Sequence, residues 1–155
     1  MARTIAVLGS TGSIGVQTLD VARRHPDKLS VVALAAGRRG NEALDQARKF
    51  GVRHVVLGVQ QDVDVPAGVE LAFGDDALIN LVKLPEVDVV VNALVGAAGL
   101  RASYETLRAG KVLALANKES LVVGGDLIMP LAAEVDAARR AAGAAPDHGD
   151  RTSVV

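Results

Sequence analysis

A run of evenly spaced glycines near the N-terminus constrains the fold of this chain most. Gly9, Gly12 and Gly15 are three residues apart, and they separate an apolar run at residues 4–8 from a helical pattern at residues 13–25. A strand, a glycine-rich turn and a helix in this order begin a βαβ unit. The glycines let a ligand approach the backbone, and the start of the helix favours a phosphate group. The run therefore predicts an α/β fold that can bind a nucleotide.

The rest of the chain alternates short apolar runs with helical patterns, as βαβ units do. The predicted strands cover residues 4–8, 29–35, 52–57, 87–93 and 111–115, and the predicted helices cover residues 13–25, 41–50, 75–84 and 99–109. A further short apolar run, which we do not assign to a strand of the sheet, covers residues 69–73. Asn41 is the expected N-cap of the second helix. Nearly continuous apolar runs are typical of parallel strands that are covered on both faces. We predict one Rossmann-like, doubly wound, mostly parallel sheet over residues 1–143, followed by a flexible tail at residues 144–155.

Composition excludes several classes of function. The formal net charge is −1 and the chain has three aromatic residues, which argues against binding to nucleic acid or to an anionic membrane. It has no cysteine, so disulfides, thiolate metal sites and thiol nucleophiles are excluded. The N-terminal segment lacks the pattern of a secretory signal, and the apolar runs are too short to span a bilayer. These features predict a cytoplasmic protein.

The turn at residues 9–15 has two readings. Its glycines and the hydroxyl groups of Ser10, Thr11 and Ser13 suit the diphosphate of a dinucleotide. It is not a Walker A loop, because Val16 follows the last glycine where that loop has lysine. The alternative is an ordinary strand-to-helix turn in which the glycines only allow close packing.

The end of the second predicted strand bears on the type of dinucleotide. Gly37, Arg38 and Arg39 occupy the place where an NAD site carries an acidic residue, and the first carboxylate after them is Glu42. Two arginines suit the 2′-phosphate of NADP, which a carboxylate would repel. The alternative is a pair of solvated arginines at the start of a helix.

Two further segments follow predicted strands at the same edge of the sheet. Residues 93–99 are mostly small and would let a nicotinamide approach the backbone, or they only pack a helix on a strand. Asn117, Lys118 and Glu119 place an amide, an ammonium and a carboxylate together. These groups could bind cofactor hydroxyls and an anionic substrate, or Asn117 and Glu119 could simply begin a helix.

Taken together, four segments resemble the 1-deoxy-D-xylulose 5-phosphate reductoisomerase family, whose members are NADPH-dependent enzymes of the non-mevalonate isoprenoid pathway. They are residues 9–15 (Gly-Ser-Thr-Gly-Ser-Ile-Gly), 31–37 (Val-Val-Ala-Leu-Ala-Ala-Gly), 95–100 (Val-Gly-Ala-Ala-Gly-Leu) and 115–122 (Leu-Ala-Asn-Lys-Glu-Ser-Leu-Val). Their order and spacing resemble the family over residues 3–125.

The resemblance implies a role for each matching residue. The glycine turn would bind the diphosphate, the segment after the second strand would bind the 2′-phosphate end, and the polar segment near residue 118 would contact NADPH and substrate. The implied cofactor-binding residues are Gly9, Thr11, Gly12, Ser13, Ile14, Gly37, Arg38, Asn117 and Glu119, to which the reasoning above adds Arg39, and the implied substrate-binding residue is Lys118.

The chain also departs from the family. Members carry a Pro-Val-Asp-Ser-Glu-His segment whose acidic residues bind a divalent metal, magnesium or manganese. Residues 141–150 read Ala-Ala-Gly-Ala-Ala-Pro-Asp-His-Gly-Asp instead, and Asp147 and Asp150 lack the required spacing. We therefore expect no metal site and no catalytic residue.

We expect the chain to be the NADPH-binding portion of an enzyme that isomerises 1-deoxy-D-xylulose 5-phosphate and reduces it to 2-C-methyl-D-erythritol 4-phosphate. It would be inactive alone, and a complementing catalytic domain or a second copy could be its partner. The alternatives are a non-enzymatic NADPH-binding module and a truncation remnant.

Overall fold

The computed structural model describes residues 2–116, 130–134, 136–138 and 141. Their central element is a six-stranded sheet in the order β4-β3-β2-β1-β5-β6, in which all neighbouring strands pair in parallel. The strands are β1 (Arg3–Leu8), β2 (Leu29–Ala36), β3 (His54–Leu57), β4 (Glu70–Phe73), β5 (Val89–Asn92) and β6 (Val112–Leu115). The predicted parallel α/β fold is confirmed.

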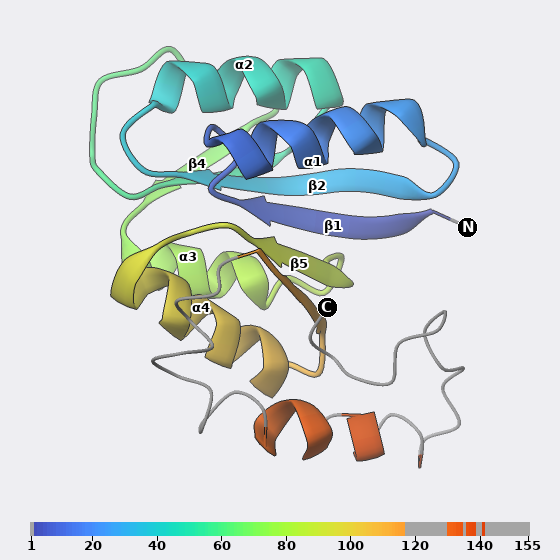
Figure 1. The fold of residues 1–155 in the computed structure, drawn as a ribbon. Coiled ribbons are helices and arrows are strands. Elements are labelled where there is room, and N and C mark those ends of the chain that lie inside the picture. The colour runs from blue at the N-terminus through green and yellow to red at the C-terminus, as the bar shows by residue number, and fades with distance from the viewer. Residues whose placement is uncertain (1, 117–129, 135, 139–140, 142–155) are drawn as a thin grey trace.

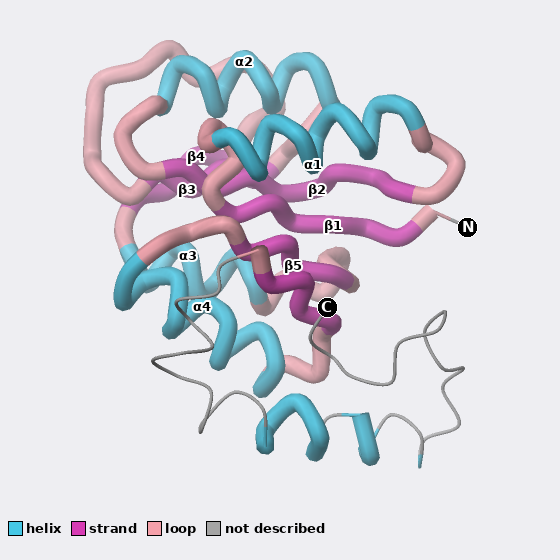
Figure 2. The backbone as a smooth tube through the Cα atoms, viewed as in Figure 1, coloured by secondary structure: helices cyan, strands magenta, loops and turns pink. Residues whose placement is uncertain are grey.

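Helices cover both faces of the sheet (Figure 1). They are α1 (Ser13–Arg24), α2 (Gly40–Phe50), α3 (Asp75–Val82) and α4 (Gly96–Arg108). Leu19 of α1 and Leu44 of α2 are buried in a core on one face, and Leu78 of α3 and Ala102 of α4 are buried in a core on the other. Figure 2 shows the same layers, with the sheet between the two pairs of helices. Both cores are aliphatic, as the composition predicts.

Strand β1 supplies both cores because its side chains alternate between the faces. Ile5 and Val7 lie in the core under α1 and α2, whereas Ala6 and Leu8 lie in the opposite core. Strand β2 follows the same alternation except at Val32, where the register passes from Ile5↔Val31 to Ala6↔Ala33. This extra residue is a bulge that keeps the two apolar faces of β2 aligned with those of β1.

The order of the strands creates a switch point between β1 and β5. The chain leaves β1 toward β2 on one side of the sheet, and β5 pairs with the other side of β1. In Figure 1 the arrows of β1, β2 and β5 point to the same side, so the loops after them leave one edge of the sheet. Ligands of open α/β sheets bind at such a point, outside the carboxyl ends of the strands.

Two predicted helix starts are wrong. Helix α2 begins at Gly40 with Arg39 at its N-cap, so Asn41 lies inside the first turn. The backbone N–H of Gly40 donates to the side chain of Gln61, a contact that local sequence does not reveal. Helix α4 begins at Gly96, three residues before the predicted start, so the small residues after β5 form its first turn.

The described part of the C-terminal region is helical at residues 130–134 and 136–138. Ala132 is buried there against Leu107 of α4 and Leu113 of β6. Within the residues that the structure describes, no helix combines the length and the apolar character that crossing a bilayer requires. The tail predicted at residues 144–155 lies outside the described residues.

Candidate nucleotide-binding site

The glycine turn after β1 is held between the ends of β2 and β5, the two strands on either side of β1. The backbone N–H groups of Gly9 and Ser10 both donate to the carbonyl oxygen of Ala35 at the end of β2, at 2.8 and 3.0 Å. Gly9 has a φ of +80°, which favours glycine. A Cβ atom at this residue would lie 3.0 Å from the carbonyl oxygen of Ala93 after β5. Only glycine therefore fits the turn where it passes β5.

The other two glycines of the turn have different surroundings. A Cβ atom at Gly15 would lie 2.1 Å from the carbonyl oxygen of Gly9 and 2.6 Å from the Cα atom of Ser10, so this glycine lets α1 pack on the turn. A Cβ atom at Gly12 would meet only the carbonyl oxygen of Gly9, at 3.5 Å. Packing alone accounts for Gly9 and Gly15, but it does not account for Gly12.

The open space at Gly12 lies at the N-terminus of α1. No side chain caps this helix, and its first turn has no acidic residue. The first backbone N–H groups of an α-helix have no acceptor within the helix, and they carry a partial positive charge. Ser13 and Ile14 in the first turn are exposed, with 43% of Ile14 accessible to solvent. An anion can therefore approach these backbone donors closely.

Beneath the turn lies a buried polar contact that sequence reasoning missed. Ser10 is fully buried, and its carbonyl oxygen accepts a hydrogen bond of 3.0 Å from Nε2 of Gln46 on α2. Oγ of Ser10 and Oε1 of Gln46 are both buried without a hydrogen-bond partner. A sequence signal did exist, because Gln46 is a polar residue three positions after the buried Ala43 and beside the apolar stripe of its helix.

The two arginines after β2 lie at the same edge of the sheet but differ in their contacts. Gly37, Arg38 and Arg39 are all exposed. The guanidinium of Arg39 forms an ion pair of 3.4 Å with Glu42, and both side chains are more than half exposed. Among the described residues the Arg38 side chain makes no ion pair. Arg39 thus matches the alternative of a solvated arginine at the start of a helix, whereas Arg38 is available to a ligand.

A buried asparagine shapes the loop between β5 and α4, and sequence reasoning gave it no role. Nδ2 of Asn92 donates to the carbonyl oxygen of Gly99 at 2.8 Å and to Oγ of Ser103 at 2.7 Å. Oδ1 of Asn92 accepts from the backbone N–H of Leu94 at 3.0 Å. Every polar atom of this side chain has a partner, so the loop has one defined shape. Its outer residue, Val95, is 72% exposed.

The polar segment expected to contact NADPH and substrate follows β6. Asn117, Lys118 and Glu119 lie outside the described residues. Ala116, directly before them, donates its N–H to the carbonyl oxygen of Asn92 at 3.0 Å. The chain therefore enters this segment at the same edge as the glycine turn.

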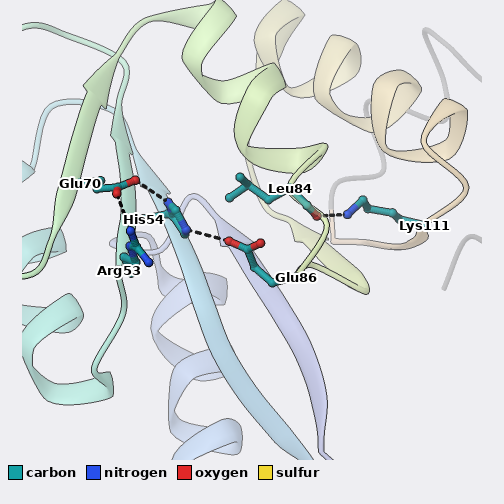
Figure 3. Close-up of polar contacts among 6 residues, drawn as sticks. All are labelled: Arg53, His54, Glu70, Leu84, Glu86 and Lys111. Carbon is teal, nitrogen blue, oxygen red and sulfur yellow. Dashed lines mark hydrogen bonds and ion pairs between the residues drawn. The ribbon is translucent and has the colours of Figure 1, made fainter.

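The opposite edge of the sheet carries a separate polar cluster, to which sequence reasoning assigned no function. Figure 3 shows His54 between two carboxylates: Nδ1 lies 3.4 Å from Glu70, and Nε2 lies 2.8 Å from Glu86. Arg53 donates to Glu70 at 2.9 Å, which holds the pKa of that carboxyl below its usual value. Burial lowers the pKa of Lys111, whose ammonium group donates to backbone carbonyl oxygens before β5. His54 and Glu70 begin their strands, so this cluster is remote from the glycine turn.

Within the described ranges, no three histidine, cysteine or acidic side chains lie close enough together to hold a metal ion. The carboxyl edge carries backbone donors at the N-terminus of α1, the hydroxyl of Ser13 and the guanidinium of Arg38, which are groups that bind phosphate.

Comparison with known proteins agrees with this geometry. The model of the 1-deoxy-D-xylulose 5-phosphate reductoisomerase family matches residues 5–125, a range that includes all four sequence segments quoted above. The chain belongs to this family. The reductoisomerase of Phocaeicola vulgatus is 44% identical over 140 residues, which cover 85% of this chain and 36% of that relative. This chain thus spans about a third of the length of the curated relatives that it matches.

Solved reductoisomerase structures are similar as well. The enzyme of Zymomonas mobilis in complex with NADPH has a TM-score of 0.72 and 35% identity, and the match covers 93% of this chain and 38% of that one. A reductoisomerase in complex with magnesium has a TM-score of 0.75 and 35% identity, and the match covers 84% of this chain and 34% of that one. The resemblance inferred from the sequence motifs is confirmed.

Proposed function

We propose that this chain is the NADPH-binding portion of a 1-deoxy-D-xylulose 5-phosphate reductoisomerase. The observation that carries the proposal is the open position at Gly12, in front of an uncapped helix and in a turn that Gly9 and Gly15 hold rigid. A Cβ atom would fill this position, so the turn fits a diphosphate in contact with its backbone. The NADPH complex of the related Zymomonas mobilis enzyme supports the choice of ligand.

In this proposal the glycine turn binds the diphosphate. Backbone N–H groups of Thr11, Ser13 and Ile14 donate to it, and the exposed hydroxyl of Ser13 can add a further donor. Gly12 donates its own N–H to the carbonyl oxygen of Gly9 at 3.2 Å, so its part is to leave room for the ligand. The N-terminus of α1 adds its partial positive charge. The formal net charge of −1 does not oppose binding of the diphosphate, because the donors are local backbone groups.

The 2′-phosphate is assigned to the segment after β2. Gly37 has no atom within 4 Å of an added Cβ position, so a ligand can lie against its backbone. Arg38 then forms an ion pair with the 2′-phosphate. Arg39 can leave its ion pair with Glu42 and bind the same phosphate. Contacts of Asn117 and Glu119 with NADPH, and of Lys118 with the sugar phosphate substrate, rest on the family resemblance alone.

The loop fixed by Asn92 is the proposed place for the nicotinamide end. It follows β5 at the switch point, next to the turn after β1. The exposed side chains of Ile14 and Val95 lie on these two neighbouring segments and offer apolar contacts to a ring. When bound, NADPH supplies a hydride for reduction. The residues of this chain bind and orient the cofactor.

We further propose that the chain alone does not convert 1-deoxy-D-xylulose 5-phosphate. Residues 141–150 lack the spacing of the acidic metal-binding segment of the family, and the described residues offer no alternative ligand set. Catalysis would require a complementing catalytic domain, alone or within a homodimer. A non-enzymatic NADPH-binding module and a truncation remnant would bind NADPH in the same way without such a partner.

The test is a calorimetric titration of the 155-residue chain with NADPH and with NADH, repeated on Arg38→Ala. We expect NADPH to bind at least about tenfold more tightly, because a charge-assisted hydrogen bond contributes about 1.5–3 kcal/mol. Arg38→Ala should lose this preference. The control Arg48→Ala removes the same charge at the far end of α2 and should keep it. Equal affinity of the unmodified chain for both cofactors would refute the NADPH assignment, and no binding of either would refute the proposed function.

A further inference from the structure

The two peptide groups on either side of Ser10 are both fixed by hydrogen bonds. The N–H of Ser10 donates to the carbonyl oxygen of Ala35 on β2, at 3.0 Å. The carbonyl oxygen of Ser10 accepts from Nε2 of Gln46 on α2, also at 3.0 Å. A strand and a helix that are distant in sequence thus set the direction of one carbonyl group in the glycine turn.

The direction of this carbonyl determines the direction of the next N–H group. The C=O and N–H of a trans peptide point in opposite directions, and the described residues contain no cis peptide bond. The carbonyl oxygen of Ser10 faces Gln46, so the N–H of Thr11 faces away from α2. No described residue accepts a hydrogen bond from this N–H. It is a free donor beside the open position at Gly12.

The orientation of the Gln46 amide follows from the same contact. A carbonyl oxygen is only an acceptor, so the NH₂ end of the amide must face Ser10. Oε1 of Gln46 and Oγ of Ser10 are then left buried and without a partner. The side chain of Gln46 thus makes one hydrogen bond to the described residues, and that bond is to the backbone of the glycine turn beneath the open anion site.

We propose that Gln46 is a positioning residue for the diphosphate of NADPH. By holding the carbonyl oxygen of Ser10 against α2, it keeps the N–H of Thr11 directed toward the ligand. Without this hydrogen bond the peptide group between Ser10 and Thr11 can rotate. The carbonyl oxygen of Ser10 would then face the diphosphate, and the two would repel each other. The inference rests on the proposed NADPH function and adds a residue that does not itself touch the cofactor.

The test replaces the donor and compares two ligands. Gln46→Met keeps the length of the side chain and removes the N–H donor. Gln46→Glu keeps the shape and places a second acceptor against the carbonyl oxygen of Ser10. The control Gln17→Met makes the same glutamine-to-methionine change at an exposed residue of α1. Each variant of the full chain is titrated with NADPH and with adenosine 2′-monophosphate, which lacks a diphosphate, and each is melted.

We expect Gln46→Met to weaken NADPH binding about tenfold and Gln46→Glu to weaken it more, with Gln17→Met unchanged. Binding of adenosine 2′-monophosphate should stay within about twofold in every variant, because a change at Gln46 acts on the diphosphate turn. Equal losses for the two ligands, or unchanged NADPH affinity in both Gln46 variants, would overturn the proposal. If Gln46→Met does not fold, Gln46→Glu decides the question.

Failure of this inference can be told apart from failure of the proposed function. If the unmodified chain does not bind NADPH, the proposed function is wrong. If it binds NADPH and the Gln46 variants bind equally well, only the role of Gln46 is wrong.

Discussion

Substituting Gly15 by alanine separates the packing role of the glycine turn from its binding role. A Cβ atom at Gly15 would lie 2.1 Å from the carbonyl oxygen of Gly9 and 2.7 Å from the carbonyl carbon of Ser10. Both are backbone atoms of a turn that two hydrogen bonds tie to β2, so they cannot move as the end of a flexible side chain could. Either α1 or the turn must shift by roughly 1 Å before the oxygen and the new carbon reach a tolerable distance.

The size of the effect follows from two opposing contributions. Overpacking of this kind costs about 1–3 kcal/mol, and contact with fixed backbone places Gly15→Ala at the upper end of that range. Alanine regains up to about 1 kcal/mol because it favours a helix more than glycine does. We expect a net loss of about 2 kcal/mol in the free energy of unfolding. For a domain of this size, such a loss lowers the melting temperature by roughly 4–8 °C.

The assay compares Gly15→Ala with Gly12→Ala by thermal melting and by NADPH titration. A Cβ atom at Gly12 would meet only one atom at an ordinary distance of 3.5 Å, so this variant should melt near the unmodified chain. It should nevertheless bind NADPH at least about tenfold more weakly, because the methyl group occupies the proposed diphosphate position. The reasoning is refuted if Gly15→Ala melts like the unmodified chain, or if Gly12→Ala is the less stable of the two.

Two further predictions concern groups that sequence reasoning left without a role. Asn92→Ala removes the hydrogen-bond partner of three buried or partly buried groups, so it should lower the free energy of unfolding, measured in urea, by about 2–3 kcal/mol. The control Asn80→Ala, on the exposed face of α3, should change this free energy little. Similar losses in both variants would contradict the account of the loop. Glu70→Gln tests the ion pair with Arg53. The pKa of Glu70 is lowered in the folded chain, so the pair stabilises the fold above the ordinary value of 4.5 and loses its effect as the pH falls through the folded value. The difference between the unmodified chain and Glu70→Gln in urea midpoint should therefore shrink on acidification, and a constant or growing difference would argue against the pair.

The sequence predicted those parts of the fold whose signals are local. The three glycines, the apolar run before them and the helical pattern after them lie within a few residues of one another, and the observed β1, turn and α1 match the prediction closely. Five of the six parallel strands follow from similar patterns. The sixth, β4, lies in the short run at residues 69–73, which is too short to be assigned from its pattern alone. The predicted start of α4 is too late because Gly96 and the alanines after it carry no amphipathic pattern, so the helix there depends on tertiary contacts.

The polar contacts that shape the candidate site could not be predicted, because they join distant positions. Gln46 contacts Ser10 across 36 positions of the chain. Its partner is a backbone carbonyl, which leaves no mark in the residue types. Asn92 ends the most strand-like run of the sequence, and its three hydrogen bonds depend on how α4 folds back over β5. In both cases the residue type suggests a hydrogen bond, but only the fold identifies the partner.

The central claim is that NADPH binds along the carboxyl edge of the sheet, with its diphosphate on the glycine turn. An NMR titration of the ¹⁵N-labelled chain with NADPH tests this claim residue by residue. We predict the largest shifts of backbone N–H signals at Thr11, Gly12 and Ser13, with a second group at Gly37 and Arg38. The signals of His54 and Glu70, at the opposite edge, should not move. Shifts centred on His54 and Glu70, or no shifts in the glycine turn at saturating NADPH, would contradict it.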